Sequence, residues 1–564
     1  MGKRPNFLIV VADDLGFSDI GPYGGEIKTP CLDKLAQDGL TLTGFHTAAA
    51  CSPTRAMLLS GTDNHIAGLG QMAEFLRNRP EFRGRPGYEG YLNFRVASAA
   101  EVMRDAGYFT AISGKWHLGL TKETCPSARG FEKDFSYLAG CGNHFNNEPQ
   151  LDAGEIKLPP VNSDGLWMEN GVFLDRKKDV PKDFYSTKTF TDKFIDILKD
   201  RDGEAAAKPF FGYLAYTAPH WPLQAPQETI AEYRGVYDQG PEALRKQRLE
   251  SMTKRGIIGP DVVPAPMFGR EHKEWADKTD EEKLLSSRRM ETYAAMVQLI
   301  DEQLARVVAH LESTGELDNT FVLFMSDNGA EGKALEALPI LNGSPLDDVV
   351  HRYYDNRLDN IGNADSFVWY GARWAAAATA PSRAFKTYTF EGGIRCPCVV
   401  RYPKLQRASA GAISHEFTTC MDILPTMLDL AGVTHPAPQF KGRDVVPMRG
   451  RSWVPYLSNN NNSVDKVHPE DTVATGWELF GRRAIRRGDY KAIFIPAPQG
   501  SDEWELFDIT QDPGENDNLA GKFPQGLQGL LEDWSKYVQD TGMYDIHETV
   551  GDAANAPPRK KQAD

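Results

Sequence analysis

Two short apolar runs, each ended abruptly by acidic or amide side chains, constrain the fold of this chain most. Phe7–Ala12 leads directly into Asp13-Asp14, and Phe321–Met325 leads into Ser326-Asp327-Asn328-Gly329. Continuous apolar runs of this length are typical of strands buried on both faces, as in the parallel sheets of α/β proteins. Ligands of such sheets bind beyond the carboxyl ends of the strands, so both polar segments are predicted to lie at one site.

Helices are expected between such strands. Ahead of the second strand, apolar residues recur at spacings of three and four, which predicts one face of an amphipathic helix. They are Val297, Ile300, Leu304, Val307 and Leu311. Earlier in the chain, Ser98 and Glu101 form a capping-box pattern that opens a helix, and Gly107 is expected to end it before a strand at Phe109–Ser113. This alternation predicts an α/β fold.

The chain has 564 residues, enough for a large α/β domain and a smaller one. Residues 1–440 are expected to form the large domain, with 224–290 as a charged helical insertion on its surface and a candidate wall of the site. Residues 441–551 are expected to form a smaller α+β domain, and 552–564 a disordered tail. In the smaller domain, the strands of an antiparallel sheet are predicted at Thr472–Thr475, Ala484–Arg486, Tyr490–Ile495 and Trp504–Phe507, and one helix at Leu527–Tyr537.

Charge and hydropathy narrow the classes of partner. The formal net charge of -15 argues against nucleic acid as a partner and requires a locally positive pocket for an anionic substrate. No apolar run approaches the roughly 20 residues that span a bilayer, and Phe7–Ala12 is too short for the core of a signal peptide. We therefore expect a cytoplasmic protein without a membrane partner.

Cys51 has the most informative setting of the 7 cysteines. Pro53 suits the first turn of a helix, which places Cys51 at a helix N-terminus, where the dipole and free N–H groups favour negative charge. Arg55 falls one turn later and can face the same side. The segment Cys51-Ser52-Pro53-Thr54-Arg55, taken alone, fits a plain helix start with an incidental thiol equally well.

Oxygen ligands dominate the two strand ends. Asp13-Asp14 and Asp327-Asn328 offer carboxylate and amide oxygens without clustered His or Cys, a pattern that selects hard cations such as calcium or magnesium. The alternative is that these side chains only cap strand ends or face solvent. Two such pairs, each directly after an apolar strand, favour the metal site.

Positive and proton-transferring side chains complete the pattern. Lys115 and His117 are two apart on an extended segment and therefore point the same way, and His220 lies in the Pro-rigid loop Pro219–Pro222. Lys386 adds another positive charge. Each residue alone is more often structural or solvated. Together they predict a site for a doubly charged oxyanion.

These motifs together resemble the type I sulfatases of the alkaline phosphatase superfamily. Cys51–Arg55 matches the Cys-x-Pro-x-Arg signature of that family, and the resemblance extends from Pro5 to Tyr537, closest to the cytosolic arylsulfatases of bacterial type. Further landmarks follow in the family's order: Asp13-Asp14, Gly114–Gly119, Asp327-Asn328-Gly329, Asp422–Thr426, Trp504–Asp508 and Asp512-Pro513. The implied fold is a large mixed sheet flanked by helices, with a smaller C-terminal α+β domain that carries an antiparallel sheet.

The resemblance also implies the nucleophile and the metal. A formylglycine-generating enzyme would oxidise Cys51 to formylglycine, whose hydrate attacks sulfur and forms a covalent sulfoenzyme. One divalent cation, calcium or else magnesium, would activate the attacking hydroxyl. Its implied ligands are Asp13, Asp14, residue 51, Asp327 and Asn328.

The remaining roles implied by the resemblance concern charge and protons. His220, with Lys386, would protonate the leaving oxygen, and Lys115 with Lys386 would stabilise the sulfuryl oxygens. His117 would take a proton from the second hydroxyl, so that sulfate leaves and the aldehyde returns. Arg55 would orient the diol. Lys115, His220 and Lys386 are thus the expected substrate-binding residues.

A small-molecule sulfate ester, with an aryl leaving group, is the expected substrate. The aromatic side chains near the site segments suit an aryl group, although core packing explains each of them as well: Trp116, Trp221, Tyr370 and Trp374. One alternative is a phosphonate or phosphate mono- or diester hydrolase of the same superfamily. Another is an inactive binding protein, if Cys51 stays unmodified.

Overall fold

The computed structural model describes residues 3–544 except 78, 155–165, 270–272, 333–345, 406, 408–409, 459–463 and 470–473. The tail predicted at 552–564 lies outside the described residues.

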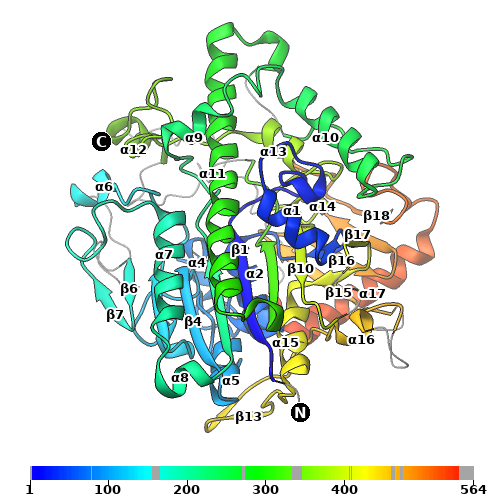
Figure 1. The fold of residues 1–564 in the computed structure, drawn as a ribbon. Helices are drawn as coiled ribbons and strands as arrows, with labels where there is room; N and C mark the ends of the chain where they lie inside the picture. Colours follow the sequence, from blue (N-terminus) through cyan, green and yellow to red (C-terminus); the bar gives the residue numbers. More distant parts are fainter. Residues whose placement is uncertain are drawn as a thin grey trace, which may run out of the picture.

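A mixed sheet, with 10 strands among the described residues, forms the centre of the molecule (Figure 1). Its strand order is β11-β2-β10-β9-β1-β8-β4-β5-β6-β7. The middle of the sheet is a parallel, fully buried group: β9 (Thr320–Ser326), β1 (Asn6–Ala12), β8 (Phe210–Ala215) and β4 (Phe109–Lys115). The strands predicted at Phe7–Ala12, Phe321–Met325 and Phe109–Ser113 are confirmed as β1, β9 and β4, each one or two residues longer than predicted.

Shorter strands extend the sheet on both sides. They are β2 (Leu40–Leu42), β10 (Cys398–Arg401), β11 (Ala412–Ser414), β5 (Lys133–Tyr137), β6 (Trp167–Glu169) and β7 (Val172–Leu174). β10 runs antiparallel to β9, and β6 runs antiparallel to β5. The large mixed sheet that the resemblance implies is therefore confirmed.

Helices cover both faces of this sheet (Figure 1). On one face lie α11 (Asp280–Ser313) and α7 (Ser186–Lys199), and on the other α2 (Cys51–Ser60), α5 (Ala99–Asp105) and α15 (Ile423–Ala431). Leu8 and Val10 of β1 belong to the core under α11, whereas Phe7 and Ile9 belong to the core under α2. Alternate side chains of one strand thus join the two layers to the sheet.

The predicted helix signals are also confirmed. Every residue of the apolar stripe between Val297 and Leu311 is buried in α11. Ser98 and Glu101 form the capping box of α5, with the Ser98 hydroxyl accepting from the Glu101 N–H and the Glu101 carboxylate accepting from the Ser98 N–H.

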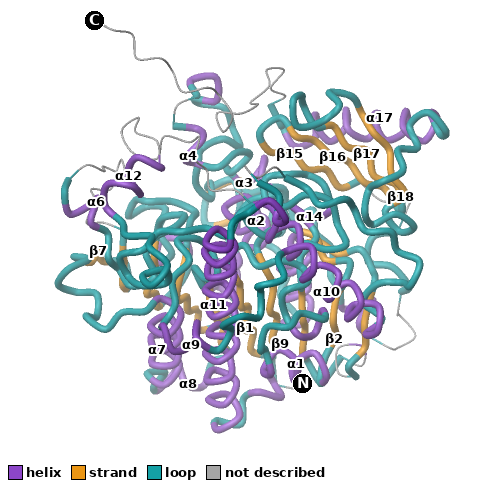
Figure 2. The backbone as a smooth tube through the Cα atoms, turned by 90° about the horizontal axis from the view of Figure 1, so that it is seen from above, coloured by secondary structure: helices purple, strands orange, loops and turns teal. Residues whose placement is uncertain are grey.

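A separate antiparallel sheet lies at one side of the central sheet (Figure 2). Its strands are β15 (Thr475–Leu479), β16 (Arg482–Arg487), β17 (Tyr490–Phe494) and β18 (Trp504–Asp508), and α17 (Pro524–Thr541) packs on its outer face. Three strands and the helix match the prediction. The first strand begins where the predicted run ends, at Thr475, and residues 472–473 lie outside the described part.

The inner face of this C-terminal sheet packs against the segment that leads into α2. Trp477, Ala484 and Ile493 share a core with Ala49 and Ala50. The indole Nε1 of Trp477 also donates to the carbonyl of Thr47 at 2.8 Å. The C-terminal sheet therefore supports the backbone just ahead of Cys51.

Within the segment 224–290, predicted as a helical insertion, the described residues form α9 (Gln227–Ala231), α10 (Pro241–Arg255) and the start of α11, with turns and irregular stretches between these helices. Arg248 of α10 is fully buried and pairs with Asp19 and with Glu26. The Asp19 carboxylate in turn accepts from the Gly16 N–H at 2.8 Å. The insertion thus braces the loop that follows Asp13-Asp14.

Among the helices that the structure describes, none combines the length and the apolar character needed to cross a bilayer.

Candidate active site

The parallel strands bring the predicted polar residues to one edge of the central sheet. Asp13 and Asp14 follow β1 directly, and Asp327 and Asn328 follow β9 directly. Lys115 is the last residue of β4, and His220 lies in the loop after β8. All these side chains are at most 5% exposed.

Asp14 lies at the centre of these contacts. Its backbone is left-handed, with φ of 67°, a conformation that is uncommon for residues other than glycine and is retained where the surroundings enforce it. The Asp14 N–H donates to Asp327 Oδ1 at 3.2 Å, and Asp14 Oδ1 accepts from Asn328 Nδ2 at 2.6 Å. The two strand ends are thus joined to each other.

Cys51 is the first residue of α2, as the Pro53 pattern predicts, and its side chain is fully buried. Its Sγ lies 3.5 Å from Asp14 Oδ1, toward which the thiol donates. Burial, with the neighbouring carboxylates of Asp14 and Asp327, raises the pKa of the Cys51 thiol well above its usual range. An unmodified Cys51 is therefore a protonated thiol and a poor nucleophile at neutral pH.

Arg55 holds the second strand end in place. Its Nε and Nη2 lie 3.0 and 2.8 Å from Asp327 Oδ2, and its Nη1 donates to the Lys115 carbonyl at 3.0 Å. Arg55 is one turn after Cys51 on α2, as expected, but these contacts are with Asp327 and with Lys115. Burial together with the nearby Asp13 raises the pKa of Asp327 to about 6.

Two buried lysines supply fixed positive charge. The Lys115 Nζ donates to both carboxylate oxygens of Asp13, at 2.9 and 2.7 Å. The Lys386 Nζ donates to Asp14 Oδ2 at 2.8 Å and lies 3.1 Å from Glu331 Oε2. Burial opposes the charge of each lysine, but the carboxylates outweigh it and raise the pKa of both. Both ammonium groups therefore stay charged at neutral pH.

His220 faces Lys386 and Asp14 through its Nε2. Its Nδ1 lies 2.6 Å from the Trp221 carbonyl, which can only accept, so Nδ1 carries the proton. The Nε2 lone pair then accepts from the Lys386 Nζ at 3.3 Å, and Nε2 lies 3.4 Å from Asp14 Oδ2. Burial lowers the pKa of His220 well below its usual value, so the ring is neutral in this arrangement.

His117 lies beside the same positive cluster and has its own carboxylate partner. Its Nε2 lies 3.2 Å from Oε1 of Glu74, in the short helix α4 (Ala73–Leu76), so Nε2 donates to this oxygen. Its Nδ1 is buried and has no partner among the described residues. Burial lowers the pKa of His117, which leaves Nδ1 as an unprotonated acceptor at neutral pH.

The sequence did not predict two carboxylates of this site, Glu74 and Glu331. Glu74 belongs to a helix of only four residues without a motif, and nothing in its sequence connects it with His117. Glu331 could have been found, because it lies three residues after Asn328 on the same strand-end segment. Both matter, because each contacts a predicted histidine or lysine.

Of the four aromatic residues proposed to suit an aryl group, three lie in the hydrophobic core and one lies beside the active-site residues. Trp116 and Trp374 are buried with their Nε1 donating to the Thr124 carbonyl and the Ser286 hydroxyl, and Tyr370 stacks on Tyr293. Core packing accounts for these three. The ring of Trp221, in contrast, lies 4.7 Å from that of His220 between centroids.

The residues present fit one divalent cation. Ligand atoms of Asp13, Asp14, Cys51 and His220 lie within 4.8 Å of one another. The Oδ1 of Asn328 is buried and has no partner within the described part of the chain, so an oxygen ligand is available beside them. Oxygen-rich donors of this kind suit calcium or magnesium. The expected ligand Asp327 adjoins this group through the N–H of Asp14.

Comparison with known proteins extends these observations to the whole chain. A family profile described as Sulfatase matches residues 5–433. A second profile, described as N-sulphoglucosamine sulphohydrolase, C-terminal, matches residues 384–532.

Individual proteins match over similar lengths. An uncharacterized sulfatase of Schizosaccharomyces pombe is 53% identical over 544 residues, covering 96% of this chain and 94% of that protein. An arylsulfatase of Klebsiella aerogenes is 35% identical over 454 residues, covering 80% of this chain and 91% of that protein. The crystal structure of Ps i-CgsB in complex with k-i-k-neocarrahexaose superimposes with a TM-score of 0.66 at 24% identity, covering 97% of this chain and 96% of that one. This last likeness concerns the fold, which is the one expected.

Proposed function

The chain belongs to the sulfatase family, and we propose that it hydrolyses aryl sulfates with a formylglycine nucleophile made from Cys51. Membership of the family supports the reaction class, the hydrolysis of sulfate esters. The likeness to an arylsulfatase supports the aryl substrate. The protonated state of the unmodified thiol supports the need for a modified residue 51.

One observation carries this proposal. Around Cys51 the chain collects two buried ammonium groups, two neutral histidines and several carboxylates, although its net charge is -15. A sulfuryl group that carries negative charge needs such preorganised donors in a site without water. Lys115 and Lys386 supply positive charge in this pocket, and the proposed cation would offset the carboxylates that they contact.

The residues that would hold the cation are Asp13, Asp14, Asp327, Asn328 and the modified residue 51, with calcium as the proposed ion and magnesium as the alternative. Bound there, the cation would supply a Lewis acid for the sulfuryl oxygens and for a hydroxyl on residue 51. The paired carboxylates already lie together because Asp14 and Asp327 share a hydrogen bond. In hydrated form, formylglycine would supply two hydroxyls on one carbon, one to attack sulfur and one whose deprotonation releases sulfate.

His220 protonates the leaving oxygen through its Nε2. This atom accepts from Lys386, while the other ring nitrogen is fixed by the Trp221 carbonyl. Nε2 is unprotonated in this arrangement, so a proton that reaches the departing oxygen through His220 would first pass from the Lys386 ammonium to Nε2. The Trp221 ring beside His220 supports an apolar leaving group at the same end of the site.

His117 accepts the proton of the second hydroxyl of the hydrated formylglycine. Its Nε2–H is held by the carboxylate of Glu74, which leaves the bare Nδ1 as the base. A histidine oriented by a carboxylate on one nitrogen and free to accept a proton on the other is the arrangement that general-base catalysis requires. Glu74 thus acts as a positioning residue for His117.

The test uses protein produced together with a formylglycine-generating enzyme. The peptide that contains Cys51 should be about 18 Da lighter than the unmodified peptide, since an aldehyde replaces the thiol. Modified protein should hydrolyse 4-nitrophenyl sulfate continuously. Cys51→Ser should release at most one equivalent of phenol, and Cys31→Ser, a matched change at a partly buried thiol, should keep full activity.

Steady turnover by purified Cys51→Ser protein would contradict the formylglycine mechanism. The substrate class is tested separately with 4-nitrophenyl phosphate and a matching aryl phosphonate ester. If either gives a higher kcat/KM than the sulfate, the protein is a phosphorus ester hydrolase. Full-length folded protein that stays unmodified and inactive in its own host would instead support the binding-protein alternative.

A further inference from the structure

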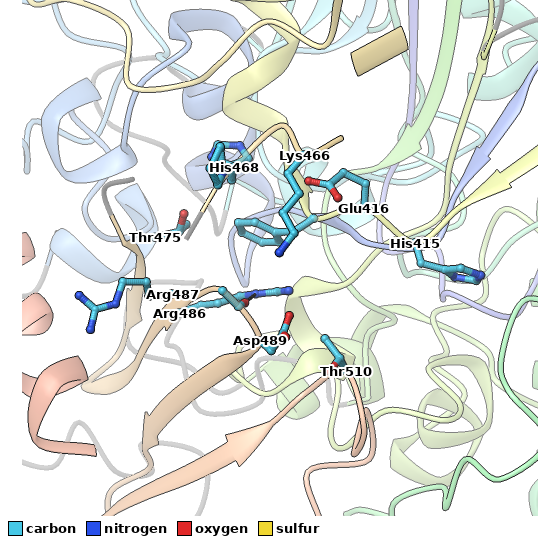
Figure 3. A pocket seen from close by; sticks show the side chains of 12 residues that line it. His415, Glu416, Lys466, His468, Thr475, Arg486, Arg487, Asp489 and Thr510 are labelled. Atoms are coloured by element: carbon cyan, nitrogen blue, oxygen red, sulfur yellow. Dashed lines mark hydrogen bonds between the residues drawn. The ribbon is translucent and has the colours of Figure 1, made fainter. Parts of the chain in front are cut away.

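A second polar pocket lies between the C-terminal sheet and the segments at 415–417 and 466–469, and its volume is about 90 Å³ (Figure 3). A cavity needs roughly 10–15 Å³ in this measure to hold a water molecule, so the pocket has room for a small polyatomic ion. The described residues that line it are all distinct from those of the active site.

Arg486 of β16 is the unusual residue in this pocket. Its side chain is only 9% exposed. Its Nε donates to the Gly488 carbonyl at 2.9 Å, and its guanidinium lies 4.0 Å from the centroid of the Phe417 ring. Within the described part of the chain, neither Nη nitrogen has a hydrogen-bond partner and no carboxylate oxygen lies within 4.0 Å of the guanidinium.

This arrangement differs from that of the fully buried arginines among the described residues. Arg55, Arg129 and Arg248 each have a carboxylate partner, namely Asp327, Glu101 and Asp19. A buried guanidinium whose Nη groups lack partners is costly, and burial lowers the pKa of Arg486 to about 10, although the carboxylates of Glu391, Asp489 and Glu416 act on it from a distance. An anion that enters the pocket would remove this cost.

The charges around the pocket define what could enter it. In Figure 3 the side chains of Lys466, Arg486 and Asp489 converge near its middle, whereas Arg487 points away. Arg487 pairs instead with Asp533 at 3.1 Å. Three carboxylates oppose an anion. Asp489 reaches the middle of the pocket, Glu416 accepts from the Val467 N–H at 2.8 Å, and the buried Glu391, which pairs with Lys491, acts on Arg486 from behind the pocket lining. The cations that face the interior are thus Arg486 and Lys466.

We propose that this pocket binds a small tetrahedral oxyanion, inorganic sulfate or phosphate, between Arg486 and Lys466. The two unpartnered Nη groups form a planar fork that can donate to two oxygens of one oxyanion, and the Lys466 ammonium adds a point charge. The ion would join β16 to the segment at 466–469 and so stabilise the packing of that segment on the C-terminal sheet. This site does not depend on the reaction proposed for residue 51.

Thermal unfolding provides the first test. Wild type is heated in sodium sulfate, in sodium phosphate and in sodium chloride of equal ionic strength, which separates specific binding from screening. At ten times the dissociation constant, sulfate or phosphate should raise the Tm by about 1 °C over chloride. The ratio of the two shifts identifies which oxyanion the pocket prefers.

Two matched variants separate this pocket from the active site, which also binds sulfate if the proposed function is right. Arg486→Met should lose at least half of the Tm rise and keep kcat and KM for 4-nitrophenyl sulfate. Arg487→Met removes the neighbouring charge whose side chain points away, and should keep the full rise. An equal rise in wild type and Arg486→Met would overturn the proposal.

Diffraction from wild-type crystals soaked in sodium selenate provides a second test that does not need a variant to fold. The proposal expects an anomalous selenium peak within hydrogen-bond distance of both Nη atoms of Arg486. A map that shows selenate at the active site and none beside Arg486 would overturn it. If Arg486→Met does not fold, this electron-density map alone tests whether the pocket binds an oxyanion.

Discussion

Lys386 donates a hydrogen bond from Nζ to the Nε2 of His220 across 3.3 Å. Since the other ring nitrogen of His220 donates to the Trp221 carbonyl, the two contacts fix one tautomer of the ring. The same Lys386 Nζ donates to Asp14 at 2.8 Å. In the proposed reaction, protonation of the leaving group would therefore be coupled to the carboxylates of the proposed metal site through a single ammonium group.

His220→Asn should weaken catalysis in a way that depends on the leaving group. Aryl sulfates with poorly acidic phenols need a proton during departure, and their kcat/KM should fall about 10²- to 10⁴-fold. 4-Nitrophenyl sulfate, whose phenolate leaves more readily, should lose less. The measurement is kcat/KM against the pKa of the phenol, and His435→Asn, at a partly buried histidine outside the site, serves as the control. Equal losses for all phenols would remove His220 from this role.

Glu74→Gln should slow the release of sulfate more than the release of phenol. Without the Glu74 carboxylate, the Nε2 proton of His117 is no longer held and the bare Nδ1 is lost in part of the population. Steady turnover should fall about 10- to 1000-fold, with a burst of one phenol per protein before it. Stopped-flow absorbance measures the burst. Glu81→Gln, at a nearby glutamate that pairs with Arg79, should leave both phases unchanged.

Removal of the cation should abolish activity and lower stability together. The carboxylates and the unpartnered Asn328 Oδ1 are brought close only in the folded chain, so the ion binds the folded state selectively. At a hundred times its dissociation constant, such an ion adds about 2.7 kcal/mol to the free energy of unfolding. Dialysis against a chelator, followed by calcium or magnesium, measures both the Tm and the recovered kcat. Asn328→Ala should require more metal for half recovery, whereas unchanged metal dependence would exclude Asn328 as a ligand.

The free energy of unfolding should fall at high pH because of His65, which lies in the short helix α3 (Asn64–Ala67). Its ring contacts Asp63 Oδ1 at 2.9 Å and Glu478 Oε2 at 3.2 Å. Burial opposes its charge, but hydrogen bonds to both carboxylates raise the pKa of His65 to about 9. Because the pKa in the folded state lies above the unfolded value of about 6.5, protonation of His65 stabilises the folded state fully below pH 6.5. This stabilisation is lost as the pH rises through 9.

The expected size of this effect follows from the two pKa values. Wild type should lose about 3 kcal/mol more than His65→Gln between pH 6 and pH 10. Urea unfolding at both pH values gives the four free energies, and the difference of differences isolates His65 from other titrating groups. His435→Gln should follow the wild type. Parallel pH profiles of wild type and His65→Gln would contradict the assignment.

The central sheet and the strand-end residues could be predicted because their pattern is local. An apolar run that stops at Asp13-Asp14 shows both the strand and its functional end within a few residues. The partners of these residues could not be predicted in the same way. Glu74 meets His117 only because α4 folds back over the strand ends, and a four-residue helix leaves no periodic pattern to find.

The C-terminal sheet shows the same limit at its first strand. The run that forms β15, Thr-Gly-Trp-Glu-Leu, contains a glycine and a glutamate and does not resemble a buried strand. Glu478 is nevertheless buried, because it accepts from Gln71 and contacts His65. Trp477 is fixed by its bond to the Thr47 carbonyl. Tertiary partners, and not strand propensity, place this element.

The packing of the C-terminal sheet behind Cys51 sets an order of events in the life of the chain. Cys51 is 1% exposed, and Ala49 and Ala50 are covered by strands that begin more than 400 residues later. If Cys51 is oxidised as proposed, the modifying enzyme must reach it before those strands leave the ribosome and dock, or while they are open. Translation itself would then provide the interval for maturation. A chain that folds completely first would keep its thiol permanently.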